Sequence, residues 1–223
     1  MYLMKRNVSP TQKVLNLWAI ILIIWSVYRT KFSFPEWFDE FIAKPLIFVL
    51  PVYLYIKKVE KKEFFPSVLL TTKNIFKDIY LAIVIGFVFA LSAFFSNYVK
   101  YGSFLSTTTI FYSASQKLST YFFIALATGF SEEILSRGFI LKRLYEESGN
   151  IYSASFVSSI LFFILHIPIL FTNIKLTGGL LLLFMGTDLI LSLANSFIFL
   201  ERKSLILPIL IHAFYNLAIV LYV

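Results

Sequence analysis

The segment SEEILSRG, residues 131–138, lies inside apolar sequence and places three ionisable side chains where an unpaired charge is costly. Adjacent residues on a helix point about 100° apart, so Glu132 and Glu133 cannot serve the same point in space. Glu133 and Arg137 are spaced i,i+4 and share a face, which predicts an ion pair between them. Glu132 has no cation at that spacing. The pattern favours one carboxylate in a structural pair and a second one available for chemistry, the alternative being an ion pair in a polar seam with no further role.

The composition of the whole chain indicates a polytopic membrane protein. Its 223 residues are 59% hydrophobic and 14% charged, whereas a soluble domain carries about 25% charged residues. Cysteine is absent, which excludes disulfides and thiolate metal sites and leaves His and carboxylate side chains as metal ligands. The net charge of +8 comes from basic residues in short loops between apolar spans. With no nucleic-acid-binding motif visible, the lipid bilayer is the expected partner of these charges, and nucleic acid is not.

Hydropathy predicts an all-α bundle of about seven transmembrane spans. The first span is expected to be an uncleaved anchor, because no small-x-small cleavage site precedes Arg29. Pro45 and Pro51 are expected to kink the second span, and none of the first three spans is expected to carry an ionisable residue at its centre. A polar connection, residues 101–116, separates the first three spans from the rest. The predicted spans are Val14–Tyr28, Phe41–Ile56, Ile79–Val99, Leu118–Leu144, Ile151–Phe171, Leu180–Leu200 and Leu205–Val223.

The distribution of Lys and Arg predicts the orientation of these spans. Thirteen basic residues fall in loops on one side and six, among them Lys44, on the other. The positive-inside rule then places the N-terminus in the cytoplasm and the C-terminus outside. We expect one transmembrane domain over residues 1–223, with apolar spans in 1–117 and the catalytic helical core in 118–223, because helices of so small a protein must pack on one another.

The two histidines of the chain both lie within apolar spans. His212 and Asn216 are spaced i,i+4 and line one helix face, as do Phe162 and His166. A lone intramembrane His can be a hydrogen-bonded packing residue, but histidines accompanied by buried carboxylates indicate an ion path, a proton relay or catalysis. Pro168 is expected to bend the helix after His166 and to open room for water.

Helix geometry indicates that these side chains can meet at one depth of the bilayer. With a rise of about 1.5 Å per residue, Glu132, His166 and His212 all reach well inside a hydrocarbon core about 30 Å thick. Asp188 reaches a similar depth. It could join the cluster or form a polar packing contact within Gly186–Asp188.

Three motifs in this order resemble those of the CAAX-protease and bacteriocin-processing (CPBP, or Abi) family of intramembrane endopeptidases. They are Glu-Glu-x-x-x-Arg at Glu132–Arg137, Phe-x-x-x-His at Phe162–His166 and His-x-x-x-Asn at His212–Asn216. The resemblance covers Leu118–Val223, whereas the first three spans match only in being apolar. Ser136 stands where the family usually has an aromatic residue, and Asp188 is an acid that the pattern does not require.

The resemblance implies catalytic roles for six residues, in a multi-pass protein of a bacterial plasma membrane. Glu132 would activate water with His166 as its partner. Glu133 and Arg137 would shape the site. His212 and Asn216 would stabilise the oxyanion. The expected function is hydrolysis of a peptide bond in a membrane-associated peptide or protein.

Metal dependence and two other functions stay open at this point. Glu132, His166 and His212 could form a zinc site with an open position for water, although no His-Glu-x-x-His signature is present. We expect a glutamate-activated water with no obligatory metal. One alternative to proteolysis is a non-catalytic immunity or regulatory protein of the same fold. The other is a proton-coupled transporter or channel, whose relay would consist of Glu132, His166, Asp188 and His212. Against transport, no inverted repeat is apparent.

Overall fold

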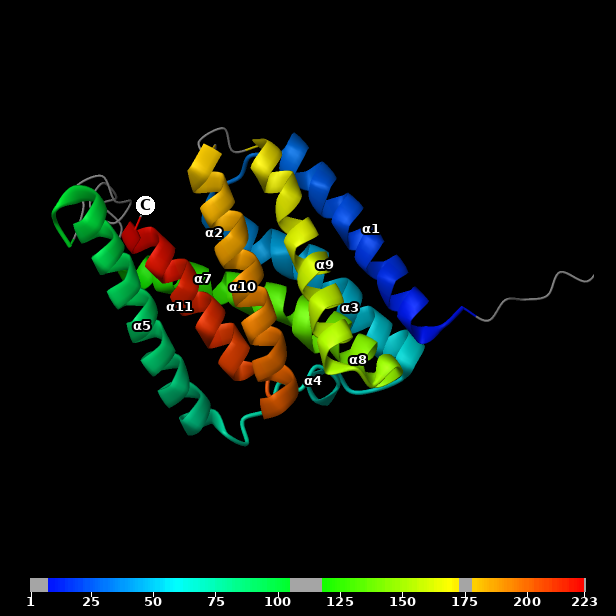
Figure 1. Cartoon of the computed structure of the whole chain (residues 1–223). Coiled ribbons are helices and arrows are strands. Elements are labelled where there is room, and N and C mark those ends of the chain that lie inside the picture. The colour runs from blue at the N-terminus through cyan, green and yellow to red at the C-terminus, as the bar shows by residue number, and fades with distance from the viewer. Residues whose placement is uncertain (1–7, 105–117, 173–177, 223) are drawn as a thin grey trace, which may run out of the picture.

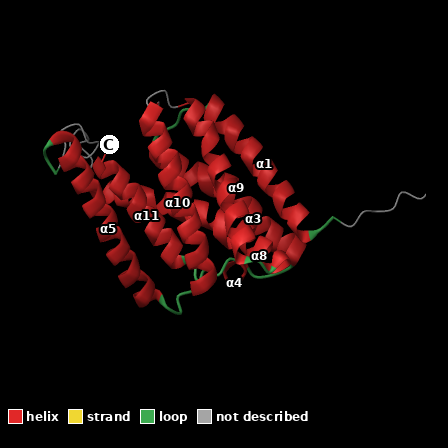
Figure 2. Cartoon of the chain, viewed as in Figure 1, coloured by secondary structure: helices red, strands yellow, loops and turns green. Residues whose placement is uncertain are grey.

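The computed structural model describes residues 8–104, 118–172 and 178–222, which form helices and no strand (Figure 2). This confirms the all-helical prediction. The elements are α1 (Pro10–Lys31), α2 (Glu36–Phe38), η1 (Asp39–Ala43), η2 (Pro45–Val49), α3 (Leu50–Tyr55), η3 (Ile56–Glu60), α4 (Phe64–Ser67), α5 (Ile75–Tyr101), α7 (Leu118–Glu133), η4 (Ile134–Leu141), α8 (Lys142–Ser148), α9 (Ile151–Thr172), α10 (Gly178–Arg202) and α11 (Ile206–Tyr222), where η denotes a π-helical turn.

The five long helices α1, α9, α10, α11 and α5 stand in a row, and a helix formed by α7, η4 and α8 crosses behind them (Figure 1). Neighbours in this row contact one another, and α11 packs on both α5 and α7. The crossing helix contacts α1 through η4 and α8, and it contacts α11 through α7. Its middle portion is enclosed, since all eight residues of η4 are buried.

Two apolar clusters hold the bundle together. The larger one joins α1 and the second helical segment, residues 36–60, to η4 through side chains such as Trp25, Phe48 and Phe139. The smaller one joins α5, α10 and α11 around Ala82 and Ile211. Burial of such side chains contributes roughly 1.5–3 kcal/mol each in water, but within a bilayer close packing and polar contacts carry more of the stability.

The two prolines of the second predicted span are accommodated by wide turns. Residues 36–60 follow one helical path in which α-helical and π-helical turns alternate. The N–H of Lys44 donates to the carbonyl of Asp39, and the N–H of Leu50 donates to that of Pro45, each five residues earlier. A proline has no N–H to donate, and a π turn shifts the pairing of backbone N–H and carbonyl groups by one residue around it. The extra residue per turn also changes the direction in which nearby side chains point.

Three helices among the described residues are long and apolar enough to cross a membrane: Pro10–Lys31, Ile75–Tyr101 and Ile151–Pro168. The protein is therefore an integral membrane protein. The fourth predicted span is divided by η4, and the apolar part of α11, Ile206–Ile219, is shorter than a full span. Most of the predicted polar connection at residues 101–116 lies outside the described residues.

Candidate active site

The acidic motif lies at the junction of α7 and η4. Glu132 and Glu133 are the last residues of α7, and Arg137 lies inside the π-helical segment. All three side chains are buried, Glu133 and Arg137 completely so. A π segment at such a position is common at functional sites, because it lets neighbouring residues point in directions that a regular helix would not allow.

Glu133 and Arg137 form the ion pair that their spacing predicts, with 3.1 Å between Arg137 Nη1 and Glu133 Oε1. Arg137 also donates to the carbonyl and the hydroxyl of Ser192 on α10, at 2.9 and 2.8 Å. Its guanidinium lies 4.4 Å from the centre of the Phe162 ring on α9. One arginine thus connects three helices, and its charge is satisfied by a carboxylate, two oxygens and an aromatic face.

Glu133 Oε1 accepts from two further groups. His212 Nδ1 lies 2.8 Å away, and Asn195 Nδ2 lies 3.2 Å away and also donates to the carbonyl of Pro208. Because a carboxylate only accepts, Nδ1 of His212 carries the hydrogen and Nε2 is left to face the other carboxylate. Sequence reasoning missed Asn195. A buried amide in an apolar helix, next to Ser196, was the available signal.

Glu132 has no cation on its own helix, as the spacing predicts, but it has one from another part of the chain. Lys44 Nζ lies 2.7 Å from Glu132 Oε1 and 2.7 Å from Glu40 Oε2. The prediction that Lys44 lies in a loop is wrong, since its side chain is buried on the helical path of residues 36–60. Helix periodicity could not predict this pair, because the two residues are 88 apart in sequence and only tertiary packing brings them together.

The second oxygen of Glu132 faces both histidines. Oε2 lies 3.5 Å from His166 Nε2 and 3.7 Å from His212 Nε2, and it is buried with no hydrogen-bond partner among the described residues. Such an orphaned carboxylate oxygen between two imidazoles is a position for a water molecule, since a buried polar atom seeks a partner. The convergence of Glu132, His166 and His212 is the arrangement that helix depths predicted.

His166 is also placed by its other ring nitrogen. Nδ1 lies 3.1 Å from the carbonyl of Phe162 and 3.6 Å from Asp188 Oδ2. The carbonyl accepts, so Nδ1 carries the hydrogen and Nε2 points toward Glu132. Asp188 therefore belongs to the cluster, which decides between the two roles that the sequence left open for it. Pro168 lies inside α9, two residues beyond His166.

Asn216 is the predicted site residue that the structure does not connect to this network. It lies one turn beyond His212 on α11, is partly exposed, and makes no hydrogen bond or ion pair with another described residue. Among the described residues its amide thus has no partner, on the helix that presents His212.

No group of three or more His, Cys, Asp and Glu side chains in the described parts of the chain is arranged to hold a metal ion. The ammonium of Lys44 on Glu132 also repels a second cation at that carboxylate. The zinc ligand set Glu132, His166 and His212 therefore does not fit a metal centre as these side chains stand.

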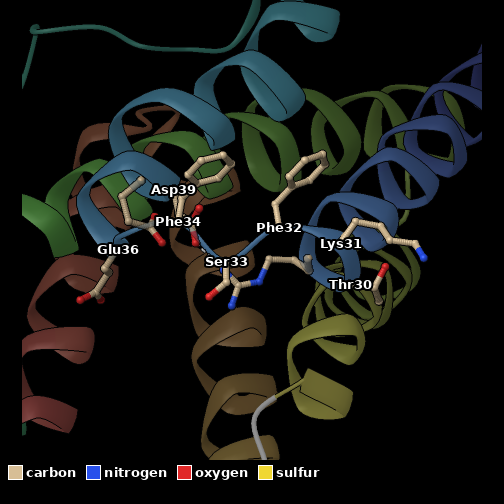
Figure 3. A pocket seen from close by; sticks show the side chains of 9 residues that line it. Thr30, Lys31, Phe32, Ser33, Phe34, Glu36 and Asp39 are labelled. Atoms are coloured by element: carbon tan, nitrogen blue, oxygen red, sulfur yellow. Dashed lines mark hydrogen bonds and ion pairs between the residues drawn. The ribbon is translucent and has the colours of Figure 1, made fainter.

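A hollow of about 600 Å³ lies where α1 turns into α2 and η1 (Figure 3). Glu40 lines this hollow and also contacts Lys44, so two ion-paired side chains separate the hollow from Glu132. The hollow thus lies near Glu132 and Glu133 but is lined by neither of them. Its lining residues are Arg29, Thr30, Lys31, Phe32, Ser33, Phe34, Glu36, Asp39 and Glu40.

Buried Glu, His and Arg side chains that converge from three helices of a membrane protein indicate an enzyme or an ion or proton relay within the bilayer. Residues 113–218 match the family model described as type II CAAX prenyl endopeptidase Rce1-like. This match to an Rce1-like domain of the CPBP family, a family of membrane proteases, confirms the resemblance seen in the three motifs. Searches of curated proteins and of solved structures gave no match.

Proposed function

We propose that this protein is an endopeptidase that cleaves a peptide bond of a membrane-associated peptide or protein with water activated by Glu132 and His166. The observation that carries the proposal is the buried, unpartnered Oε2 of Glu132, which faces Nε2 of two histidines from two other helices. A water held there has a base within reach on one side and imidazole on the other, which is the arrangement that general-base hydrolysis requires.

The proposed steps use only side chains of this chain. Glu132 takes a proton from the water, and the resulting hydroxide attacks the carbonyl carbon of the peptide bond. The negative charge then develops on the carbonyl oxygen, where Asn216 and the protonated form of His212 can donate hydrogen bonds. Collapse of this intermediate breaks the C–N bond, and the proton held by Glu132 and His166 passes to the leaving amine. Glu133 and Arg137 hold the helices of the site in place and take part in no chemical step.

The proposed metal-free mechanism agrees with the position of Lys44, which already supplies a positive charge at Glu132. No cofactor is required, since the base, the donors and the acid are all side chains. A substrate that is cleaved inside this apolar bundle would reach the site along the bilayer. This supports a membrane-associated peptide or protein as the substrate class.

We further propose the finer topology that hydropathy predicts: seven spans in one domain of a bacterial plasma membrane, with the N-terminus inside. Helices occupy each of the predicted spans, and residues 10–67 pack directly on the core, for example through Arg143 and Glu60 at 2.8 Å. A reporter fused after Val223 should behave as extracytoplasmic. Cytoplasmic behaviour of the reporter would overturn the orientation.

The decisive experiment compares wild type with Glu132→Gln in liposomes that carry a library of membrane peptides. Gln keeps the shape of the side chain and removes the base. Cleavage should fall by several orders of magnitude with the amount of folded protein unchanged, because general-base catalysis and positioning are lost together. Equal cleavage by the two proteins would show that Glu132 is not the base. If neither protein cleaves any peptide, the non-catalytic alternative is the better description.

A further inference from the structure

The most unusual charged group outside the three motifs is Lys44, between the π-helical segments η1 and η2. Its side chain is buried, and its ammonium bridges Glu40 and Glu132 at 2.7 Å each. The ring of Trp25 lies 5.9 Å from Nζ and offers its face to the cation. Burying an ammonium is expensive unless it is fully paired, so these contacts account for the placement of a lysine inside an apolar bundle.

The bridge is anchored to α7 at two points. The Thr128 hydroxyl donates to Glu40 Oε2 at 2.7 Å, and its oxygen lies 3.0 Å from the carbonyl oxygen of Ile124. Thr128 stands one turn before Glu132 on the same helix, so Thr128, Glu40, Lys44 and Glu132 close a ring of polar contacts across two helices. Lys44 therefore has little freedom to move relative to Glu132.

This ring decides which oxygen of Glu132 is available. The carboxylate is planar, and Lys44 holds Oε1, so Oε2 is directed toward His166 and His212. The charged and titratable groups that face Glu132 are Lys44 from the second helix, His166 from α9 and His212 from α11. The neighbouring Glu133 is turned away, toward Arg137.

We propose that Lys44 is a positioning residue for Glu132, which rests on the proposed role of Glu132 as the base. It holds the carboxylate in the orientation that presents Oε2 to the water, and it keeps the group charged in an apolar site. Lys44 lies outside residues 113–218, which match the family model. The active site is consequently incomplete without the first part of the chain, and that part does more than anchor the protein in the bilayer.

The test compares Lys44→Met and Lys44→Arg with a matched control, Arg143→Met. The control breaks another ion pair between the first part of the chain and the core, Arg143 with Glu60 at 2.8 Å, and Arg143 contacts neither Glu132 nor the two histidines. We expect Lys44→Met to lower kcat per folded protein by about hundredfold, the size of effect that a small misplacement of a catalytic group produces. KM should change little, Lys44→Arg should recover much of the loss, and Arg143→Met should keep the wild-type kcat per folded protein.

A purely structural role for Lys44 predicts another pattern: less folded protein for Lys44→Met, with wild-type kcat in the fraction that folds. That result, or an equal loss of kcat in Arg143→Met, would overturn the proposal. Should Lys44→Met fail to fold, the double variant Lys44→Met/Glu40→Gln removes one of the two carboxylates that lose their cation, Glu40. Glu132 is then left without the side chain that fixes its orientation. The double variant should fold and show the same loss of kcat, and wild-type kcat in it would contradict the proposal.

A second measurement does not depend on proteolysis and separates this inference from the proposed function. Dicyclohexylcarbodiimide couples to carboxyl groups in apolar surroundings that are not held in an ion pair. The peptide containing Glu132 should gain the reagent's mass in Lys44→Met and not in wild type or Arg143→Met. Equal labelling of Glu132 in wild type and Lys44→Met would overturn the inference even if the enzyme is active. The expected labelling pattern without cleavage by wild type would support Lys44 as the holder of Glu132 and refute the peptidase assignment.

Discussion

Glu132 and Glu133 are adjacent in sequence, but their surroundings differ in origin. Glu133 is held by Arg137 one turn away and by His212 and Asn195, all of which lie in the segment that matches the family model. Glu132 is held by Lys44, which comes from the first part of the chain. One carboxylate has a cation dictated by helix periodicity, and the other has a cation that only packing can deliver.

The two carboxylates also differ in how many donors they accept from and in what their second oxygen faces. Oε1 of Glu133 accepts from three donors, which is the condition of a structural group. Oε1 of Glu132 is held by Lys44 alone. Oε2 of each carboxylate is buried without a hydrogen-bond partner among the described residues, but Oε2 of Glu132 faces Nε2 of two histidines, at 3.5 and 3.7 Å. The difference teaches that neighbouring acids in one motif can divide their roles, one fixing the helices and one left available for water.

The largest expected effect concerns Arg137, whose removal takes away the cation that pairs with Glu133. Arg137→Ala strands a fully buried carboxylate, which should cost about 3–5 kcal/mol of stability. The yield of folded protein in detergent and its thermal unfolding temperature should both fall, and activity with them. If Arg137→Ala is inactive yet as stable as wild type, the pair acts in catalysis and the division of roles is wrong.

The next effect concerns Asn216, next to the histidine that touches both carboxylates. His212 reaches Glu133 through Nδ1 and faces Glu132 through Nε2. If Asn216 donates to the oxyanion, Asn216→Ala should lower kcat by about 10²–10³, the usual loss for one such donor. Folded yield should not change, because Asn216 has no hydrogen-bond partner among the described residues. A kcat within a factor of two of wild type would remove Asn216 from the mechanism.

A smaller effect is expected at Asp188, which lies beside His166 and therefore acts on Glu132 only through that histidine. Asp188→Asn removes the charge facing His166 Nδ1 but leaves the hydrogen bond to the carbonyl of Phe162. We expect kcat to fall about tenfold, equivalent to about 1.4 kcal/mol of transition-state stabilisation. A loss as large as that of Glu132→Gln would show that Asp188 takes part directly in proton transfer.

The smallest effect is expected from chelation. With Lys44 already neutralising Glu132, incubation with a strong zinc chelator should leave cleavage unchanged. The measurement is the initial rate of peptide cleavage before and after chelation, with added zinc as the control. Loss of activity on chelation and its recovery with zinc would make Glu132, His166 and His212 ligands and would require Lys44 to release Glu132.

The sequence by itself determined the helices, the ion pair of Glu133 with Arg137 and the meeting of Glu132 with both histidines. These follow from local rules: apolar length sets the helices, i,i+4 spacing sets the pair, and rise per residue sets the depth of each side chain. The predicted helix positions agree with the observed ones within a few residues at most ends.

Only the tertiary structure decided what completes the site. The contacts of Lys44 with Glu132, of Asn195 with Glu133 and of Asp188 with His166 each join different helices. Helical periodicity carries no information about which face of one helix meets which face of another. The π-helical turns around residues 39–49 and 134–141 also change side-chain directions in a way that a regular 3.6-residue period does not predict. The counter-ion of Glu132 therefore came from packing, because the residue that supplies it has no periodic relation to the residue that needs it.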